Sequence, residues 1–222
     1  FLFMCFLPST VQSSIAFTSV ARGNVAAAVC SASFSNIIGM FITPIMVAFF
    51  ILGQTSHGFD PTSSIIQITL LLLVPFILGQ ILRPYVFPHM QKRPKIVKVF
   101  DQGSILMVVY GAFSSAVVAG LWSQISMSTL MLLILACSVL LTLIMLLSLY
   151  IPKWLGFNAA DQKTIFFCGS KKTLASGVPM AQILFIGQPI GMIVLPIMIF
   201  HQIQLMVCGV IANYWSKQSE QD

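Results

Sequence analysis

The sequence has 222 residues, of which 58% are hydrophobic and 7% are charged, and its mean hydropathy is +0.97. A soluble domain carries about 25% charged residues, so this composition excludes a water-soluble globular protein and indicates an integral membrane protein. The net charge of +6 is interpreted through the positive-inside rule, and nucleic acid is not an expected partner.

The chain begins in an apolar stretch without an initiator methionine, so we expect it to be a fragment that lacks an N-terminal part. Residues 1–7 are predicted to end a membrane span. Pro8 cannot continue the helical hydrogen bonding, and the hydroxyls after it can satisfy the freed backbone groups. A break in the span is therefore predicted here. The polar side chains at this break are candidate binding residues: Ser9, Thr10, Gln12, Ser13 and Ser14.

A loop is predicted at 22–24, and the uncharged stretch that follows is long enough to cross the membrane once, at about 25–52. The first half of this span is rich in small residues, which allow helices to approach closely. Ser31, Ser35 and Asn36 are candidates for lining a site. The alternative is that they form a packing face.

The middle of the chain predicts three further spans. The first covers 63–82, after a loop at 53–62. A hydrophilic loop with five basic residues is expected at 83–101, where it sets the topology or, alternatively, binds anionic lipid headgroups. Residues 102–152 contain no charge and suit two spans with a turn near 120–124. After a loop at 153–163, the remaining predicted elements are a broken span at 165–185, a turn at 187–189 and a last span at 191–214.

Two adjacent lysines lie within the apolar segment 165–185. A lysine in the middle of a membrane helix costs roughly 2.5–3.5 kcal/mol on insertion scales. The neighbouring glycine and hydroxyls, with Pro179, also disfavour a continuous helix. A second break with a binding site at bilayer depth is predicted, and the alternative is that the lysines extend to the membrane surface. The candidate residues are Gly169, Ser170, Lys171, Lys172 and Thr173.

The positive charges of the loops fall on one side of this topology. Nine of the 11 basic residues share that side, and the other two are Lys171 and Lys172. By the positive-inside rule the shared side is cytoplasmic, and so is the C-terminus. The lysine pair is thus not explained by topology.

A short pattern, G-M-x-x-x-P-I-M, occurs at 39–46 and again at 191–198. Each copy lies in the span that follows a predicted break, and the two spans enter the membrane from opposite sides. This arrangement is typical of an inverted-topology repeat with paired broken helices.

Half-helix N-termini at the breaks, together with two lysines, favour an anionic substrate. Alternatively, one lysine takes the place of a coupling cation and carries a proton during transport. The five cysteines form no C-x-x-C pair, so neither a zinc site nor a disulfide framework is expected. An enzyme is not expected, because no predicted span contains an aspartate, and His201 is interpreted as a packed, hydrogen-bonded histidine.

Three parts of the sequence carry a family resemblance. They are the polar cluster at 8–14, the Arg-Gly-Asn turn before a small-residue span that ends in Thr43-Pro44, and Lys163-Thr164-Ile165 before a polar break. They resemble the bile acid:sodium symporter family, most closely the divergent branch of predicted symporters in solute carrier family 10. The resemblance implies an all-α membrane protein of ten helices in two inverted five-helix repeats, with core and panel domains.

On this resemblance, the chain covers about helices four to ten. Residues 1–52 end the first repeat and residues 53–222 form the second. The resemblance implies a secondary transporter, in a bacterial cytoplasmic membrane, that moves a small organic anion by alternating access with Na⁺ or H⁺ coupling. A bile acid, another carboxylate or a sulfated solute is the expected class of substrate.

Some residues depart from the family pattern. Ser9 and Thr10 replace glycines, Ser14 replaces an asparagine, and lysines stand where relatives carry a sodium-binding glutamate and glutamine. Sodium binding by the family's arrangement is therefore not expected, and no other cofactor is predicted. The alternative function is a non-transport membrane regulator of ion (calcium) homeostasis with the same fold.

Overall fold

The computed structural model describes residues 1–52, 61–118, 120, 125–185 and 188–218. Most of these residues are helical, and no β-strand occurs among them. The helices are α1 (Leu2–Phe6), α2 (Val11–Val20), α3 (Val25–Val47, continued by a π-helical turn at Ala48–Leu52), α4 (Pro61–Gln91), α5 (Pro94–Val118), α7 (Met127–Trp154), α8 (Ala159–Gly169), α9 (Leu174–Leu184) and α10 (Ile190–Gln218). The predicted all-α class is confirmed.

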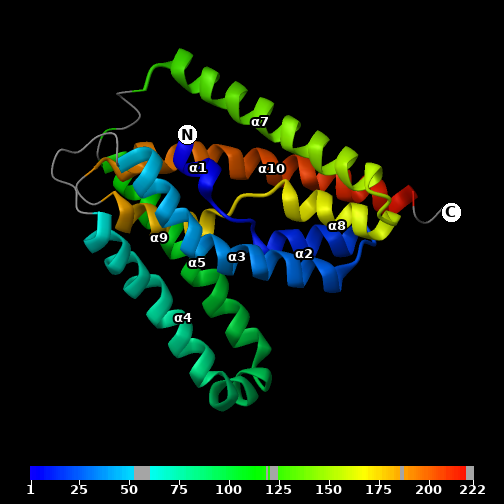
Figure 1. Cartoon of the computed structure of the whole chain (residues 1–222), viewed down its shortest axis with the longest axis horizontal. Helices are drawn as coiled ribbons and strands as arrows, with labels where there is room; N and C mark the ends of the chain where they lie inside the picture. The colour runs from blue at the N-terminus through cyan, green and yellow to red at the C-terminus, as the bar shows by residue number, and fades with distance from the viewer. Residues whose placement is uncertain (53–60, 119, 121–124, 186–187, 219–222) are drawn as a thin grey trace.

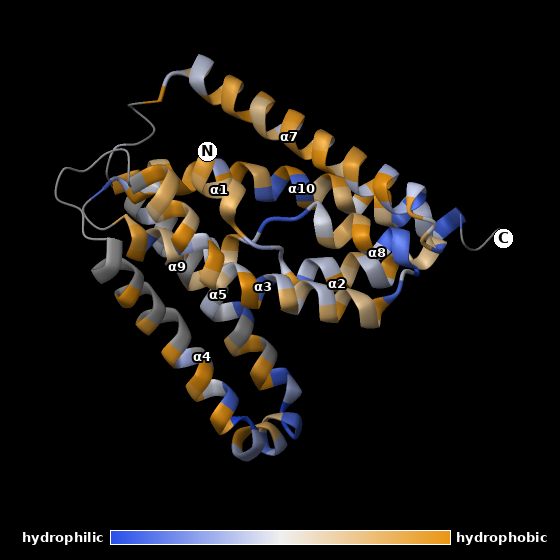
Figure 2. Ribbon diagram, viewed as in Figure 1, coloured by the Kyte–Doolittle hydropathy of each residue, from blue (hydrophilic) through white to orange (hydrophobic). Residues whose placement is uncertain are grey.

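Three helices of the described part are long and apolar enough to cross a membrane: Val25–Ile51, Met127–Trp154 and Ile190–Gln218. Apolar residues cover most of their surface, including the outward face of α7 (Figure 2). Outward-facing side chains such as Leu135 and Val210 are exposed, as lipid-facing residues are. The chain is therefore an integral membrane protein.

Two broken helices cross near the middle of the molecule. Residues 7–10 separate α1 from α2, and residues 170–173 separate α8 from α9. The two links meet between α3 and α10, with α7 packed on the outer side of α8 and α10 (Figure 1). Both predicted breaks are confirmed.

The turn at 22–24 connects α2 to α3 and is hydrogen-bonded to the start of α8. The side chain of Asn24 caps α3 by accepting a hydrogen bond from the amide of Ala27, and its Nδ2 donates to Oδ1 of Asp161 at 2.8 Å. Asn158 caps α8, and its Nδ2 donates to the other oxygen of Asp161. The predicted loop is confirmed, and its hydrogen bonds hold the start of α3 against the start of α8.

The loop predicted at 83–101 is wrong. Helix α4 continues to Gln91, and α5 begins at Pro94 after two non-helical residues. With 31 residues, α4 is about 46 Å long, which exceeds the roughly 30 Å of bilayer hydrocarbon. Charged residues on a helix end beyond the hydrocarbon remain in water and carry no insertion cost. The basic residues at 83–101 therefore did not require a loop. In Figure 1 the connected ends of α4 and α5 extend away from the other helices, while α5 also packs against α9 and α10.

The two elements predicted for 102–152 are the helices α5 and α7, and α7 is one of the helices long and apolar enough to cross a membrane. Most of the loop predicted at 53–62 and of the turn predicted near 120–124, and the first residue of the turn predicted at 187–189, lie outside the described residues.

The first break packs closely on α3. A Cβ atom added to Gly39 would lie 2.5 Å from Cβ and 2.7 Å from Cγ of Pro8. We expect Gly39→Ala to destabilise the fold by about 1–3 kcal/mol, because either the proline ring or α3 must move. Thermal unfolding in detergent would measure this loss. Gly79→Ala in α4 is the matched control, with nothing within 4 Å and no expected loss. Equal melting temperatures for both variants would contradict the close contact.

Candidate functional site

Lys172 binds the carbonyl oxygens that end the first half-helix. Its Nζ donates to the carbonyl oxygen of Cys5 at 2.7 Å and to that of Leu7 at 3.0 Å. The last carbonyls of a helix have no partner within the helix, and they carry the negative end of its dipole. The ammonium group therefore satisfies two acceptors that would otherwise be unpaired in an apolar environment.

The neighbouring carbonyls also have donors. Thr43 Oγ1 donates to the carbonyl of Phe6 at 2.7 Å, and the amide of Thr173 donates to the carbonyl of Pro8 at 3.0 Å. All four consecutive carbonyls from residue 5 to residue 8 are thus hydrogen-bonded, half of them by one lysine.

Hydroxyl groups of the first break satisfy carbonyls of the second. Each donates across the crossing: Ser9 Oγ to the carbonyl of Cys168 at 2.6 Å, Ser14 Oγ to that of Phe167 at 3.3 Å, and Thr10 Oγ1 to that of Lys172 at 2.9 Å. The two breaks therefore complete each other's hydrogen bonding. This is what allows irregular backbone at membrane depth.

Gln204 of α10 holds the peptide groups of Lys172 in place. Its Oε1 accepts from the amide of Lys172 at 3.0 Å, and its Nε2 donates to the carbonyl of the same residue at 3.0 Å. His201 lies one turn away, with Nδ1 2.8 Å from Nε2 of Gln204 and 3.3 Å from the carbonyl of Lys172. Gln204 is fully buried. His201 is hydrogen-bonded as predicted, and its side chain is half-buried.

Lys171 points to the other side of the crossing. Its side chain is 1% exposed, and its Nζ donates to the carbonyl of Ser13 at 3.0 Å. The same ammonium lies 3.7 Å from the ring centroid of Phe17, a cation–π contact. Lys171 therefore does not extend to the membrane surface, which was the alternative interpretation.

Three buried hydroxyl groups have no hydrogen-bond partner within the described part of the chain: Oγ of Ser13, Oγ1 of Thr18 and Oγ of Ser170. Two of these residues lie beside the lysine, since Lys171 binds the carbonyl of Ser13 and follows Ser170 in the chain. Thr18 packs at the 22–24 turn, where its Cγ2 would lie 2.8 Å from a Cβ added to Gly23.

A cavity of about 660 Å³ opens beside the crossing. It is bounded by the start of α2, the start of α9, one face of α10 and part of α5. The polar residues in its wall are Thr10, Gln12, Ser13, Gln102, His201 and Gln202, and the apolar ones are Ala16, Leu106, Leu174, Ala175 and Leu205. Its walls are thus apolar with a few polar groups, as in small-molecule sites.

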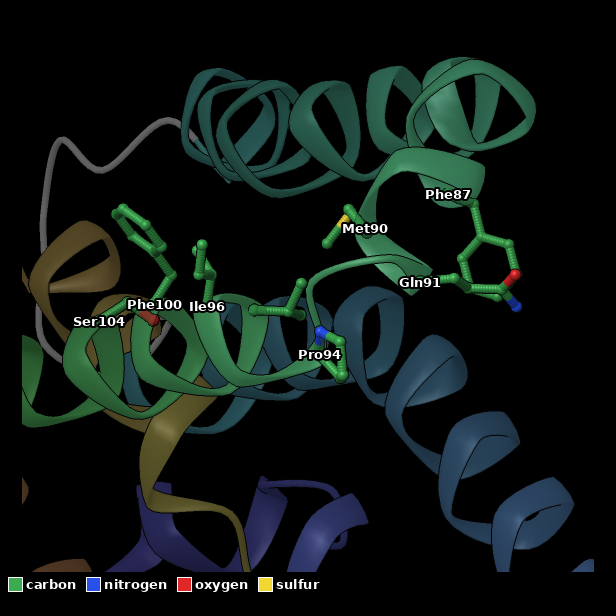
Figure 3. A pocket seen from close by; sticks show the side chains of 8 residues that line it. Phe87, Met90, Gln91, Pro94, Ile96, Phe100 and Ser104 are labelled. Carbon is green, nitrogen blue, oxygen red and sulfur yellow. The ribbon is translucent and has the colours of Figure 1, made fainter.

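A second cavity, of about 840 Å³, lies between the ends of α4 and α5 (Figure 3). Its lining side chains are almost all apolar, including Phe87, Met90 and Phe100, and it is far from both breaks in the fold. Without convergent polar groups it has little to select a solute, so we do not take it as the functional site.

The structure brings most of the predicted residues together at the crossing. The amide of Ser9 also donates to Oγ of Ser35, and Asn36 is half-buried next to it. Of the predicted residues, Thr10, Gln12 and Ser13 line the cavity. Ser31 is exposed on α3, and a Cβ on Gly169 would lie 2.9 Å from Oγ of Ser148 in α7. These two residues do not line the cavity.

Sequence reasoning missed Gln204 and the α5 wall of the cavity. A glutamine in the middle of the apolar helix Ile190–Gln218 was the available signal, because a polar side chain in a membrane span requires a partner. Among the described residues, no group of three His, Cys, Asp or Glu side chains is arranged to hold a metal ion.

Comparison with known proteins gives a consistent result. A family model described as "SBF-like CPA transporter family" matches residues 1–217. Protein PA2026 from Pseudomonas aeruginosa is 51% identical over 99% of this chain, and "Putative symporter YfeH" from Escherichia coli is 49% identical over all of it. The rat protein named "Sodium/bile acid cotransporter 7" is 28% identical over 92% of the chain. The chain spans 66% of the length of each bacterial relative and 60% of the rat protein.

Proposed function

This chain belongs to the SBF-like CPA transporter family, and we propose that the protein is a secondary transporter of a small organic anion. The resemblance to bile acid:sodium symporters and their solute carrier relatives is confirmed at the level of the family. A membrane transporter follows from that membership. The substrate, its charge and the transport mechanism are our proposal.

The observation that carries the proposal is the cavity beside the crossing. The first residues of α2 and α9 line it, so two half-helices begin at its wall. The first amides of a helix have no partner within the helix and carry the positive end of its dipole. Thr10, the N-cap of α2, makes no capping hydrogen bond and donates instead to the second break. The positive end of the α2 dipole therefore lies at this wall.

The charges at the crossing, next to the cavity wall but not part of it, support an anion. Two buried ammonium groups lie at the crossing, and both contact main-chain carbonyl oxygens. Asp161 is the acidic residue whose side chain the structure describes. It accepts hydrogen bonds from Asn24 and Asn158 at the start of α8, away from the crossing. The positive charge at the crossing therefore favours a carboxylate or sulfate group. The apolar part of the wall suits the hydrocarbon part of the same solute.

We further propose alternating access between two bodies. The cavity lies between α5 on one side and the helices of the crossing on the others. We assign the crossing helices to a core domain and the α4–α5 hairpin to a panel domain, with residues 1–52 and 53–222 belonging to successive inverted repeats. Movement of the core against the panel would expose the cavity to each side of the membrane in turn.

The proposal is tested by uptake into liposomes that contain the purified full-length protein. Taurocholate serves as the bile-acid probe, and a sulfated steroid and a short aliphatic carboxylate serve as the other anions. We expect Ala16→Trp to lower uptake of the transported anion about tenfold or more, because the indole would fill the cavity. The melting temperature should be unchanged, since Ala16 is exposed.

Ala26→Trp is the matched control, because Ala26 is exposed on α3 and does not line the cavity. Normal uptake by Ala16→Trp would refute the proposed cavity. An absence of flux for every anion, together with altered calcium handling in cells that lack the protein, would instead support the membrane-regulator alternative.

A further inference from the structure

We infer that the ammonium group of Lys172 is a built-in cation that fills a carbonyl site at the end of α1, a site that would hold a free monovalent cation if the lysine were shortened. The inference deepens the proposed function, because it concerns which ion the crossing uses. The test measures the binding of a cation, so the inference holds or fails independently of anion transport.

The ligands of this ammonium group are of the kind that cation sites use. Its partners are two main-chain carbonyl oxygens, of Cys5 and Leu7, at 2.7 and 3.0 Å. Both belong to the end of a half-helix, where the carbonyls point out of the helix without internal donors. In broken-helix transporters, such helix ends and unwound carbonyls coordinate the coupling cation.

The surrounding contacts hold the ammonium group in this position. Gln204 binds both peptide groups of Lys172, and the amide of Thr173 donates to the carbonyl of Pro8. The backbone that carries the lysine is therefore tied to α10 and to the first break. Because the lysine is part of the chain, its charge stays among the carbonyls. A free ion would lose translational entropy on binding at the same place.

The position differs from that of the adjacent lysine. Lys171 contacts a single carbonyl, of Ser13, which lies within α2, and an aromatic face. A carbonyl within a helix already accepts a helical hydrogen bond, so it requires no cation. The carbonyls of Cys5 and Leu7 lie at the end of a helix, and they are the ones that a cation would satisfy.

The consequence is that the site at the end of α1 does not take sodium in the intact protein. Any sodium dependence of transport would have to arise at another place. Shortening the lysine should convert the fixed charge into an exchangeable one, because two unpaired carbonyls in an apolar crossing attract a small cation.

The test is thermal unfolding of the purified full-length protein in detergent at constant ionic strength, in choline, sodium, potassium or methylammonium chloride. The wild-type melting temperature should be the same in all four salts. Lys172→Ala should melt roughly 5 °C lower or more in choline. It should regain at least half of that loss in one of the small cations, with a rise that depends on cation concentration, as ligand binding requires.

Lys163→Ala is the matched control, because Lys163 also donates to a main-chain carbonyl, of Ala21 at 2.9 Å, but outside the crossing. It should show no cation-dependent rise. Lys172→Gln is the second variant if Lys172→Ala does not fold. Its neutral amide should give a folded protein of intermediate stability, and methylammonium should stabilise it further.

Two results would overturn the inference. One is a sodium-specific rise in the wild-type melting temperature that Lys172→Gln abolishes, since a free cation would then share the site with the lysine. The other is the absence of any cation-dependent rise in both Lys172 variants. If the protein transports no anion in any salt, the proposed function is contradicted, but the effect of cations on the melting temperature can still be measured.

Discussion

Replacing Gln204 by leucine is expected to cause the largest loss of stability of any single change at the crossing. Its amide group satisfies both the N–H and the C=O of Lys172 and is fully buried. A buried group left without its partner costs about 1–3 kcal/mol, and the N–H has no other acceptor that the structure records. In the variant, the carbonyl of Lys172 still accepts a hydrogen bond from the hydroxyl of Thr10, at 2.9 Å in the wild type. Uptake should be lost with the fold of the second break.

Gln202→Leu is the matched control for this prediction. Gln202 lies on the same helix, two residues away, but its side chain is exposed and lines the cavity. The melting temperature of Gln202→Leu should remain near that of the wild type. Thermal unfolding in detergent compares the two variants directly. If they have equal stability, Gln204 does not hold the second break in place.

Replacing Lys171 by methionine is expected to separate transport from stability. Methionine keeps most of the length and volume of the side chain and can contact the ring of Phe17 through its sulfur. It also removes a buried charge whose insertion costs roughly 2.5–3.5 kcal/mol. The melting temperature should therefore be unchanged or higher. Uptake should fall about tenfold or more, because one of two positive charges at the crossing is lost.

The control for Lys171→Met is Lys163→Met, which removes a half-buried lysine from the start of α8. Uptake by Lys163→Met should be retained. Uptake by proteoliposomes and thermal unfolding must be measured on the same preparations. Normal transport by Lys171→Met would show that its charge does not serve the substrate. A large fall in melting temperature would show instead that the charge is structural.

The two breaks could be predicted from the sequence because their residues conflict with a membrane helix. Pro8 lacks an amide hydrogen, and Lys171 and Lys172 are costly in an apolar span. Local chemistry of this kind requires no knowledge of the fold. The same reasoning failed at 83–101, where charge and proline occur on helix ends that extend past the hydrocarbon.

The partners of these residues could not be predicted in the same way. The hydroxyls at 9, 10 and 14 were expected to face a ligand. All three donate to carbonyls at the end of α8 or in the second break, and Thr10 also lines the cavity. Each partner lies more than 150 residues away in the chain, so no pattern of spacing reveals the pairing. Gln204 was missed for the same reason, although its polarity within an apolar helix was visible.

The sequence by itself determined that this is a helical membrane protein with two broken spans and an unexplained pair of lysines. These features depend on composition and on local backbone chemistry, which each residue carries wherever it lies. Only the tertiary structure decided what each lysine contacts, because the crossing places carbonyls from one break against donors from the other. Lys171 and Lys172 are adjacent in the chain, yet one binds within α2 and the other at the end of α1. That difference arises from packing between distant segments.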